Sequence, residues 1–324
     1  MSSCVCSEID DNCVEKDKLH VIAVVNNPRR FKRRYELFQN FVKHMSTFKH
    51  VILYVVELAF GDRSFEIAKK NKDDLIPPER QLQLRSSSEI WHKENMINLG
   101  VQHLLPSDWN YMAWIDADLQ FTNEKWDIET IHCLQHHPIV QLWMTCADLG
   151  PEGETLQLHK SFGWLHFTGK IPGEKYGEYM HSGYAWGMTK EAWNQCGGLI
   201  DFAILGAADH HQALCFIGKY EKGLPGNCSE SYRRHIEAYQ LRCDKFNHNI
   251  GYVPGTIVHF WHGKKKDRKY NERWEILINN NYDPTTDICK DHQGLIKLTG
   301  NKPKLGHQIS KYFIQRNEDS IDTE

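Results

Sequence analysis

The sequence predicts an α/β fold in which helices flank a mostly parallel central sheet, formed as a single domain. Three observations support this fold class. Apolar, β-branched runs are continuous rather than alternating, which is typical of strands covered on both faces. Segments with helical periodicity separate these runs, and strands that alternate with helices form parallel sheets. The third run ends abruptly in carboxylates, and such sheets bind ligands at the carboxyl ends of their strands.

The first part of the chain supplies two strands and two helices. Strands are predicted over residues 19–25 and 50–58, with a helix over 29–45 between them. Arginines and lysines crowd the start of this helix, where they oppose its dipole. Either they form a solvated face, or an anion binds at the strand-to-helix corner. A second, amphipathic helix is expected over 86–105.

The strand over residues 111–115 leads into the main candidate site. It is followed by Asp116 and Asp118, whose side chains project to the same side of an extended backbone. Two carboxylates beside an apolar core need a counter-charge, and oxygen ligands suit Mg²⁺ or Mn²⁺. An exposed acidic turn is the simpler alternative.

The middle of the chain is expected to continue the alternation. A helix is predicted over 126–136 and a strand over 139–146, whereas residues 148–180 are rich in turn-forming residues. A short strand near Tyr184 precedes a helix that Thr189 caps.

Two later segments carry candidate functional groups. Asp209 begins an apolar helix, where the dipole keeps a carboxylate ionised, although a plain helix cap is the simpler interpretation. A strand over 251–258 leads to His259 and His262, and a basic run follows at 264–268. Histidines beside this run suit a metal together with an acidic ligand, while a buried histidine and a solvated basic face are the alternatives.

Composition excludes several classes of protein. The chain of 324 residues is 40% hydrophobic and 25% charged, which indicates a globular protein. Its formal net charge of −3 gives no basic field for nucleic acid. Residues 1–18 lack the apolar core of a signal peptide, and no run reaches membrane-spanning length. We expect a soluble, cytoplasmic protein with no membrane span, no nucleic-acid partner and a flexible tail over 1–18.

The ten cysteines are scattered without paired CxxC spacing, so most are expected to be buried thiols. Cys4, Cys6 and Cys13 could bind a metal or pair with each other, but a loose tail is the simpler interpretation.

Taken in order, these landmarks resemble those of a GT-A-fold glycosyltransferase, closest to the inverting β-1,4-galactosyltransferase group, over about residues 19–285. The metal motif of that family is similar to Asp116-Ala117-Asp118, its Met-x-x-His ligands to His259-x-x-His262, and its catalytic Glu-Asp pair to Ala208-Asp209. Its nucleotide-binding landmarks are similar to segments that contain Asn27, Pro28, Arg30, Arg34, Glu57, Lys93 and Asn95. Its small-residue strand and following turn are similar to Gly183, Gly187, Thr189-Lys190 and Gly197-Gly198-Leu199.

The chain also departs from the family. The Trp-Gly-Trp-Gly-Gly acceptor segment is represented only by residues 204–208, and Ala208 replaces the Glu of the catalytic pair. The acceptor is therefore open, and the base assignment depends on Asp209 alone.

The resemblance implies a Rossmann-like GT-A domain over 19–300, with a nucleotide-binding half (19–146), an acceptor and catalytic half (147–300), and a poorly ordered polar tail over 301–324. It implies transfer of a sugar from a nucleotide-diphosphate sugar, here a UDP-sugar, to a hydroxyl group. The acceptor is a glycan, a protein or a small molecule, and the configuration at the anomeric carbon is inverted.

The same resemblance implies a role for each site residue. Asp118 binds Mn²⁺ or Mg²⁺, Asp116 holds the ribose or a metal-bound water, and His262 closes the metal site, with His259 as a further ligand. Asp209 is the general base. A lid over the phosphates is expected from Lys264, Lys265, Lys266 and Arg268. Trp186 or Trp164 could stack on a sugar near Gly183, although packing in the core is the simpler interpretation for any single tryptophan.

Two other functions fit parts of the pattern. A sugar-1-phosphate nucleotidyltransferase shares the half-sheet and metal aspartates, but it would need a Gly-rich loop where Asn26-Asn27-Pro28 stands. An inactive transferase relative that binds glycans is compatible with Ala208.

Overall fold

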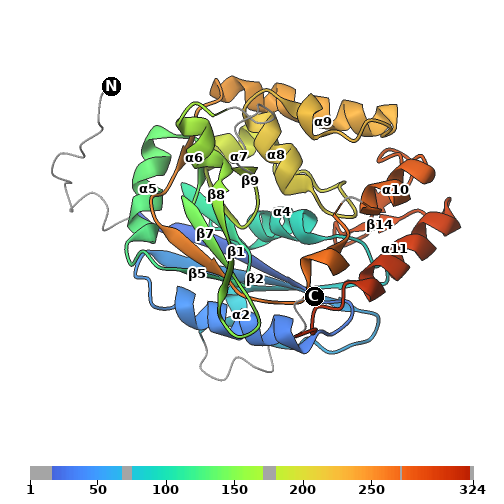
Figure 1. The fold of residues 1–324 in the computed structure, drawn as a ribbon, viewed down its shortest axis with the longest axis horizontal. Coiled ribbons are helices and arrows are strands. Elements are labelled where there is room, and N and C mark those ends of the chain that lie inside the picture. Colours follow the sequence, from blue (N-terminus) through green and yellow to red (C-terminus); the bar gives the residue numbers. More distant parts are fainter. Residues whose placement is uncertain (1–16, 68–74, 171–179, 271, 322–324) are drawn as a thin grey trace.

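A seven-stranded sheet forms the centre of the computed structural model, which describes residues 17–67, 75–170, 180–270 and 272–321 (Figure 1). From edge to edge its strands are β11 (Ile250–Tyr252), β6 (Ile139–Gln141), β10 (Ala185–Thr189), β4 (Tyr111–Ile115), β1 (Leu19–Asn26), β2 (Val51–Phe60) and β3 (Gln81–Ser86). Only β10 runs against its described neighbours in this sheet. The α/β class with a mostly parallel sheet is therefore confirmed.

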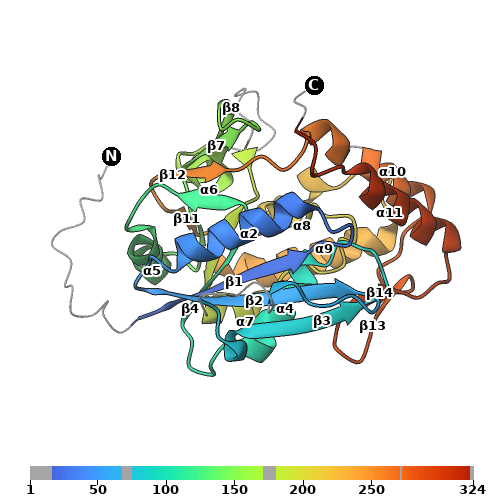
Figure 2. The same cartoon turned by 90° about the horizontal axis from the view of Figure 1, so that it is seen from below.

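Helices cover both faces of this sheet, as its continuous apolar strands predict. Successive residues of β1 face opposite sides: Val21 and Ala23 pack in one buried cluster, whereas Ile22 packs in the other. Figure 2 shows α2 (Lys32–Met45) and α4 (Lys93–Leu104) on opposite sides of the sheet. The remaining α-helices are α5 (Trp126–His136), α6 (Phe162–Phe167), α7 (Lys190–Cys196), α8 (Ala208–Phe216), α9 (Glu230–Cys243), α10 (Glu272–Asn279) and α11 (Pro303–Gln315).

A second sheet lies next to the carboxyl ends of β4, β6 and β11, from which the chain runs directly into it. Its strands, in spatial order, are β5 (Leu119–Phe121), β12 (Thr256–His259), β7 (Thr145–Leu149), β8 (Thr155–Ser161) and β9 (Met180–His181). The predicted strand over 139–146 is in fact β6 and β7, which lie in different sheets. The predicted strand over 251–258 divides in the same way into β11 and β12, at Pro254 and Gly255, whose φ is 129°. Both segments therefore cross from the first sheet to the second.

Two further predictions about elements are corrected. The helix expected over 86–105 begins at Lys93, because the preceding residues form β3 and a turn. The segment 148–180, expected to consist of turns, contains β8 and α6. Residues 171–179 of it lie outside the described residues, as does most of the predicted tail over 1–18, including Cys4, Cys6 and Cys13.

The C-terminal segment is the largest correction. The expectation of a poorly ordered tail from residue 301 is wrong, because α11 buries Leu305, Ile309, Tyr312 and Phe313 against the rest of the fold. These residues recur at helical spacing, so their burial can offset the entropy of ordering the segment. Before α11 lies the hairpin of β13 (Ile288–Lys290) and β14 (Ile296–Leu298).

The shorter elements are single turns of 3₁₀-helix. They are η1 (Pro78–Arg80), η2 (Tyr220–Gly223), η3 (Asp244–Phe246) and η4 (Lys265–Arg268). Among the described residues, no helix combines the length and apolar composition that crossing a membrane requires.

Candidate active site

Asp118 and the histidines His259 and His262, about 140 residues apart in the chain, lie together at the edge of the second sheet. Antiparallel pairing of β5 with β12 sets His259 opposite Leu119, beside Asp118. The Asp118 Oδ2 atom lies 3.0 Å from His262 Nε2 and 3.8 Å from His259 Nε2, and the two Nε2 atoms are 3.3 Å apart. One carboxylate and two imidazoles therefore face a common point.

This donor set fits a divalent metal ion. One oxygen and two nitrogens suit the transition-metal cations better than Mg²⁺, which prefers an all-oxygen shell. The other carboxylate oxygen, Asp118 Oδ1, is buried and accepts no hydrogen bond from the described residues. Although burial favours the neutral acid, the two histidines hold the pKa of Asp118 well below its usual range. Burial, together with Arg268, lowers the pKa of His262 to about 4, so this ring is neutral and able to ligate.

The side chain of Asp116 has other partners than that of Asp118. Its carboxylate forms an ion pair with Lys93 of α4, and its backbone N–H donates to the Tyr184 carbonyl at 2.9 Å. Asp116 therefore stands next to the three metal-ligand candidates, but it is not among the groups whose ligand atoms converge.

These residues open onto a cleft of about 760 Å³ at the carboxyl ends of β1 and β4. The sequence-predicted site residues that line it are Asn27, Pro28, Arg34, Lys93, Asp116, Asp118, Gly183, Asp209, His259, His262, Lys265 and Arg268. The structure therefore gathers most of the predicted site in one place.

Asp209 enters the cleft from the first turn of α8. A Cβ atom at Gly183 would lie 3.0 Å from both Asp209 Oδ2 and His181 Cε1, so a side chain there would press on the carboxylate. Burial favours the neutral acid, but Lys93 and nearby histidines outweigh it and hold the pKa of Asp209 below its usual value. Asp209 is therefore an ionised carboxylate that lines the same cleft as the metal-ligand candidates.

Glu94 is a second carboxylate in the same cleft, which the sequence did not single out as a site residue. It is only 5% exposed, and burial raises its pKa to about 7, with Asp209 adding to the effect. A carboxyl group poised near neutrality is typical of functional sites.

Two basic groups of the cleft, Arg34 and Arg316, already have an anionic partner from the C-terminal segment. The carboxylate of Glu318, 2% exposed, pairs with Arg34 and accepts from Arg316 Nε at 2.6 Å. The Asp319 carboxylate accepts from the backbone N–H groups of Lys32 and Arg33, at 3.0 and 2.9 Å. The anion expected at the strand-to-helix corner is thus supplied by the chain itself.

Five of the predicted nucleotide- and sugar-binding residues lie outside this cleft, which corrects their proposed contacts, and so do Lys264 and Lys266 of the predicted lid. Trp186 is 2% exposed and packs in the core, with its indole N–H donating to the Ser182 carbonyl, so its faces cannot receive a sugar. Trp164 lies on α6, where Lys160 and Lys170 cover its ring.

The other three residues of this group make structural contacts. Asn95 bonds the backbone of Gly294 and Ile296. Glu57 accepts from the backbone N–H groups of Glu66 and Ile67. Arg30 has 61% of its side chain exposed and pairs with Glu66.

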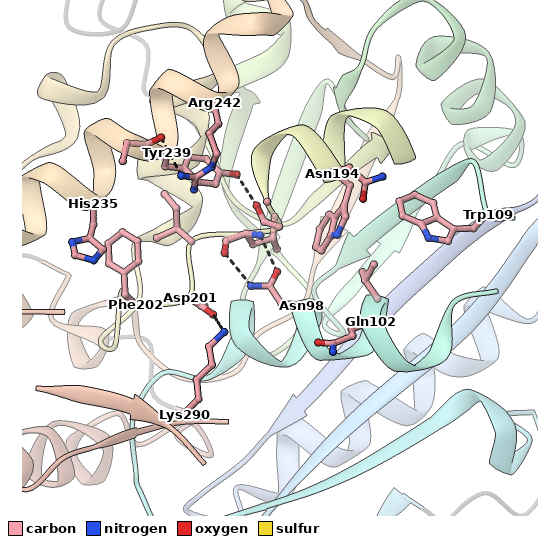
Figure 3. Close-up of a pocket in the computed structure, with 17 residues that line it drawn as sticks. Asn98, Gln102, Trp109, Asn194, Asp201, Phe202, His235, Tyr239, Arg242 and Lys290 are labelled. Atoms are coloured by element: carbon pink, nitrogen blue, oxygen red, sulfur yellow. Dashed lines mark hydrogen bonds and ion pairs between the residues drawn. The ribbon is translucent and has the colours of Figure 1, made fainter. Parts of the chain in front are cut away.

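A second cavity, of about 610 Å³, lies between α4, α7 and α9 (Figure 3). Several of its polar groups form hydrogen bonds within the lining of the cavity. Asn98 bonds both the N–H and the carbonyl of Leu199, and Arg242 donates to the Cys196 carbonyl at 2.7 Å. It contains none of the predicted site residues, and its contacts hold α7 and α9 in place.

None of the protein-family models matches this sequence, and no curated protein is significantly similar to it. Three solved structures with a similar arrangement are as follows. A Drosophila β-1,4-galactosyltransferase 7 mutant in complex with manganese, UDP-Gal and xylobiose is 14% identical over 89% of this chain and 97% of its own, with a TM-score of 0.43. The TarS protein of S. aureus, in complex with UDP-GlcNAc, is 7% identical over 75% of this chain and 58% of its own, with a TM-score of 0.43.

The third is a 4-diphosphocytidyl-2C-methyl-D-erythritol synthase of Anaerococcus prevotii. It is 12% identical over 76% of this chain and 90% of its own, with a TM-score of 0.37. These three proteins share a broadly similar arrangement of the chain with this protein, at low sequence identity.

Proposed function

We propose that this protein is a metal-dependent glycosyltransferase that moves a sugar from a nucleotide diphosphate to a hydroxyl acceptor with inversion. The observation that carries the proposal is the meeting of Asp118, His259 and His262 in a cleft that also holds an ionised Asp209. A UDP-sugar is the donor that the motif resemblance implies. A glycan, protein or small-molecule hydroxyl is the acceptor.

The metal-ligand candidates belong on the leaving-group side of the reaction. A divalent cation held there, Mn²⁺ in our proposal, would supply Lewis-acid stabilisation of the departing diphosphate. Arg268 and Lys265 offer positive charge to the phosphates.

Asp209 belongs on the acceptor side. It accepts the acceptor hydroxyl proton while that oxygen bonds to the anomeric carbon and the bond to the diphosphate oxygen breaks, its electron pair leaving with the diphosphate. A single displacement of this kind inverts the anomeric centre. Lys93, which contacts Asp116 and favours the ionised form of Asp209, connects the two sides of the cleft.

Product analysis tests the proposal. The protein is incubated with Mn²⁺ and a panel of nucleotide sugars, with and without hydroxyl acceptors. Release of nucleoside diphosphate, lost on addition of EDTA, supports the transferase. Release of pyrophosphate from a nucleoside triphosphate and a sugar phosphate would instead indicate a nucleotidyltransferase. No turnover combined with glycan binding would indicate an inactive relative.

A further inference from the structure

Asp148, at the end of β7, accepts more hydrogen bonds than an ordinary structural carboxylate needs. It is 2% exposed. Its Oδ1 accepts from Tyr184 Oη at 2.7 Å and from His259 Nδ1 at 3.0 Å. Its Oδ2 accepts from His159 Nε2 at 2.7 Å and from the Lys265 ammonium. An ionised carboxylate only accepts, so each of these partners must donate.

The contact with Asp148 places a proton on the Nδ1 atom of His259. Because the Nδ1 atom carries the proton that it donates to Asp148, the lone pair of a neutral His259 lies on Nε2. That Nε2 atom is the one that faces Asp118 and His262. The parallel register of β12 with β7 aligns His259 with Asp148, so the backbone itself sets this contact.

We propose that Asp148 is a positioning residue, which holds His259 in the ring orientation and tautomer that make its Nε2 atom a metal ligand. The inference rests on the metal site of the proposed function. Histidine ligands commonly donate their second ring N–H to a carboxylate, which fixes the ring and makes it a stronger ligand. A sulfur ligand, as in the resembled Met-x-x-His motif, needs no such partner.

The test is Mn²⁺ affinity, measured without nucleotide or sugar by the EPR signal of free Mn²⁺. Asp148→Asn keeps the side-chain shape but removes the charge. We expect Mn²⁺ binding to weaken by about 10- to 100-fold, as for other partners of metal-ligating histidines. Unchanged affinity in the folded variant would overturn the inference.

A double-mutant cycle separates positioning from a general structural effect. If Asp148 acts through His259, then Asp148→Asn should weaken Mn²⁺ binding in the native background but have no further effect when combined with His259→Ala. The visible absorption of bound Co²⁺ should shift towards that of His259→Ala in the single Asp148→Asn variant. An equal loss of affinity in both backgrounds would show that Asp148 acts by another route.

Asp127 provides a matched control. It is a buried carboxylate, 3% exposed, which accepts from the backbone N–H of His50 at 3.2 Å and does not line the cleft. Asp127→Asn should leave Mn²⁺ affinity unchanged whatever it does to the melting temperature. If Asp148→Asn does not fold, Asp148→Glu, which keeps the charge but displaces the carboxylate, replaces it with the same expected loss.

Failure of the inference and failure of the proposed function give different results. If the unmodified protein binds no Mn²⁺, the metal site itself is wrong, and the inference falls with it. If it binds Mn²⁺ and Asp148→Asn binds equally well, only the positioning role is wrong.

Discussion

Replacing Asp209 by Asn is the substitution that most sharply tests the proposed chemistry. The side chain projects from the first turn of α8, but the structure records no side-chain cap for this helix. Lys93 keeps Asp116 as its ionic partner when the Asp209 charge is removed. The variant should therefore fold normally, with its free energy of unfolding changed by no more than about 1 kcal/mol.

The expected effect on rate is much larger than that on stability. A general base contributes about 10²- to 10⁴-fold to the rate, and each factor of ten is about 1.4 kcal/mol of activation free energy. We therefore expect kcat to fall by about 10²- to 10⁴-fold, which corresponds to an increase of about 3 to 5.5 kcal/mol in the activation free energy. The dissociation constants for Mn²⁺ and nucleoside diphosphate should stay within about twofold of their original values. Rates come from released nucleoside diphosphate, and affinities come from calorimetry.

Glu94 is the alternative candidate for the general base. If Asp209→Asn retains turnover and Glu94→Gln loses it, Glu94 is the base and the present assignment is wrong. The pH profile separates the two as well. Because the pKa of Asp209 lies below its usual value, the rate should not depend on this group between about pH 5 and 8. With Glu94 as the base, the rate would rise as the pH increases through about 7.

Three further predictions concern the cleft and the fold. Mg²⁺ should support nucleotide binding much less well than Mn²⁺, because two imidazoles are poor Mg²⁺ ligands; equal support in calorimetry would argue against a site containing both histidines. Gly183→Ala should lower kcat with little change in donor affinity, because its methyl group would lie 3.0 Å from Asp209 Oδ2 and displace the base; an unchanged kcat would show that the carboxylate position is not critical. Ile309→Ala, at a fully buried position of α11, should cost about 2 to 5 kcal/mol in urea unfolding, and a negligible cost would mean that α11 is not docked.

Long, regular segments were predictable from the sequence. The bounds of β4 and α5 agree with the prediction, and Thr189 caps α7 by accepting from the Ala192 N–H at 3.1 Å. In each case a periodic apolar pattern extends over a whole element, or a cap residue marks its end, so local physics decides the structure.

The second sheet was not predictable in the same way. Its strands have two to seven residues, and some continue from strands of the central sheet without a break in the apolar pattern. Short runs cannot establish a period, and the change from one sheet to the other depends on pairing between segments far apart in sequence. The merging of β6 with β7, and of β11 with β12, in the prediction follows from this.

The site residues that belong to a local sequence motif could be predicted. Those that depend on the pairing of strands far apart in the sequence could not. Asp118 and His262 stand at the ends of predicted strands, and they meet. Asp148 gains its role only because β7 pairs with β12. Glu318 reaches Arg34 across 284 residues of chain, which no local pattern indicates.

The tryptophan assignments show a different limit. Alternation of apolar and polar residues along a strand indicates which side chains are buried. It does not show which face of the sheet borders a cleft. Trp186 lies on a strand that is covered on both faces and therefore packs in the core.

The central claim is that side chains from two distant segments hold one cation. The most direct measurement is the anomalous scattering of manganese in crystals grown with Mn²⁺ and UDP. We predict a single strong peak in contact with Asp118, His259 and His262 together. A peak that touches only one of these side chains, or that lies elsewhere in the molecule, would contradict the claim.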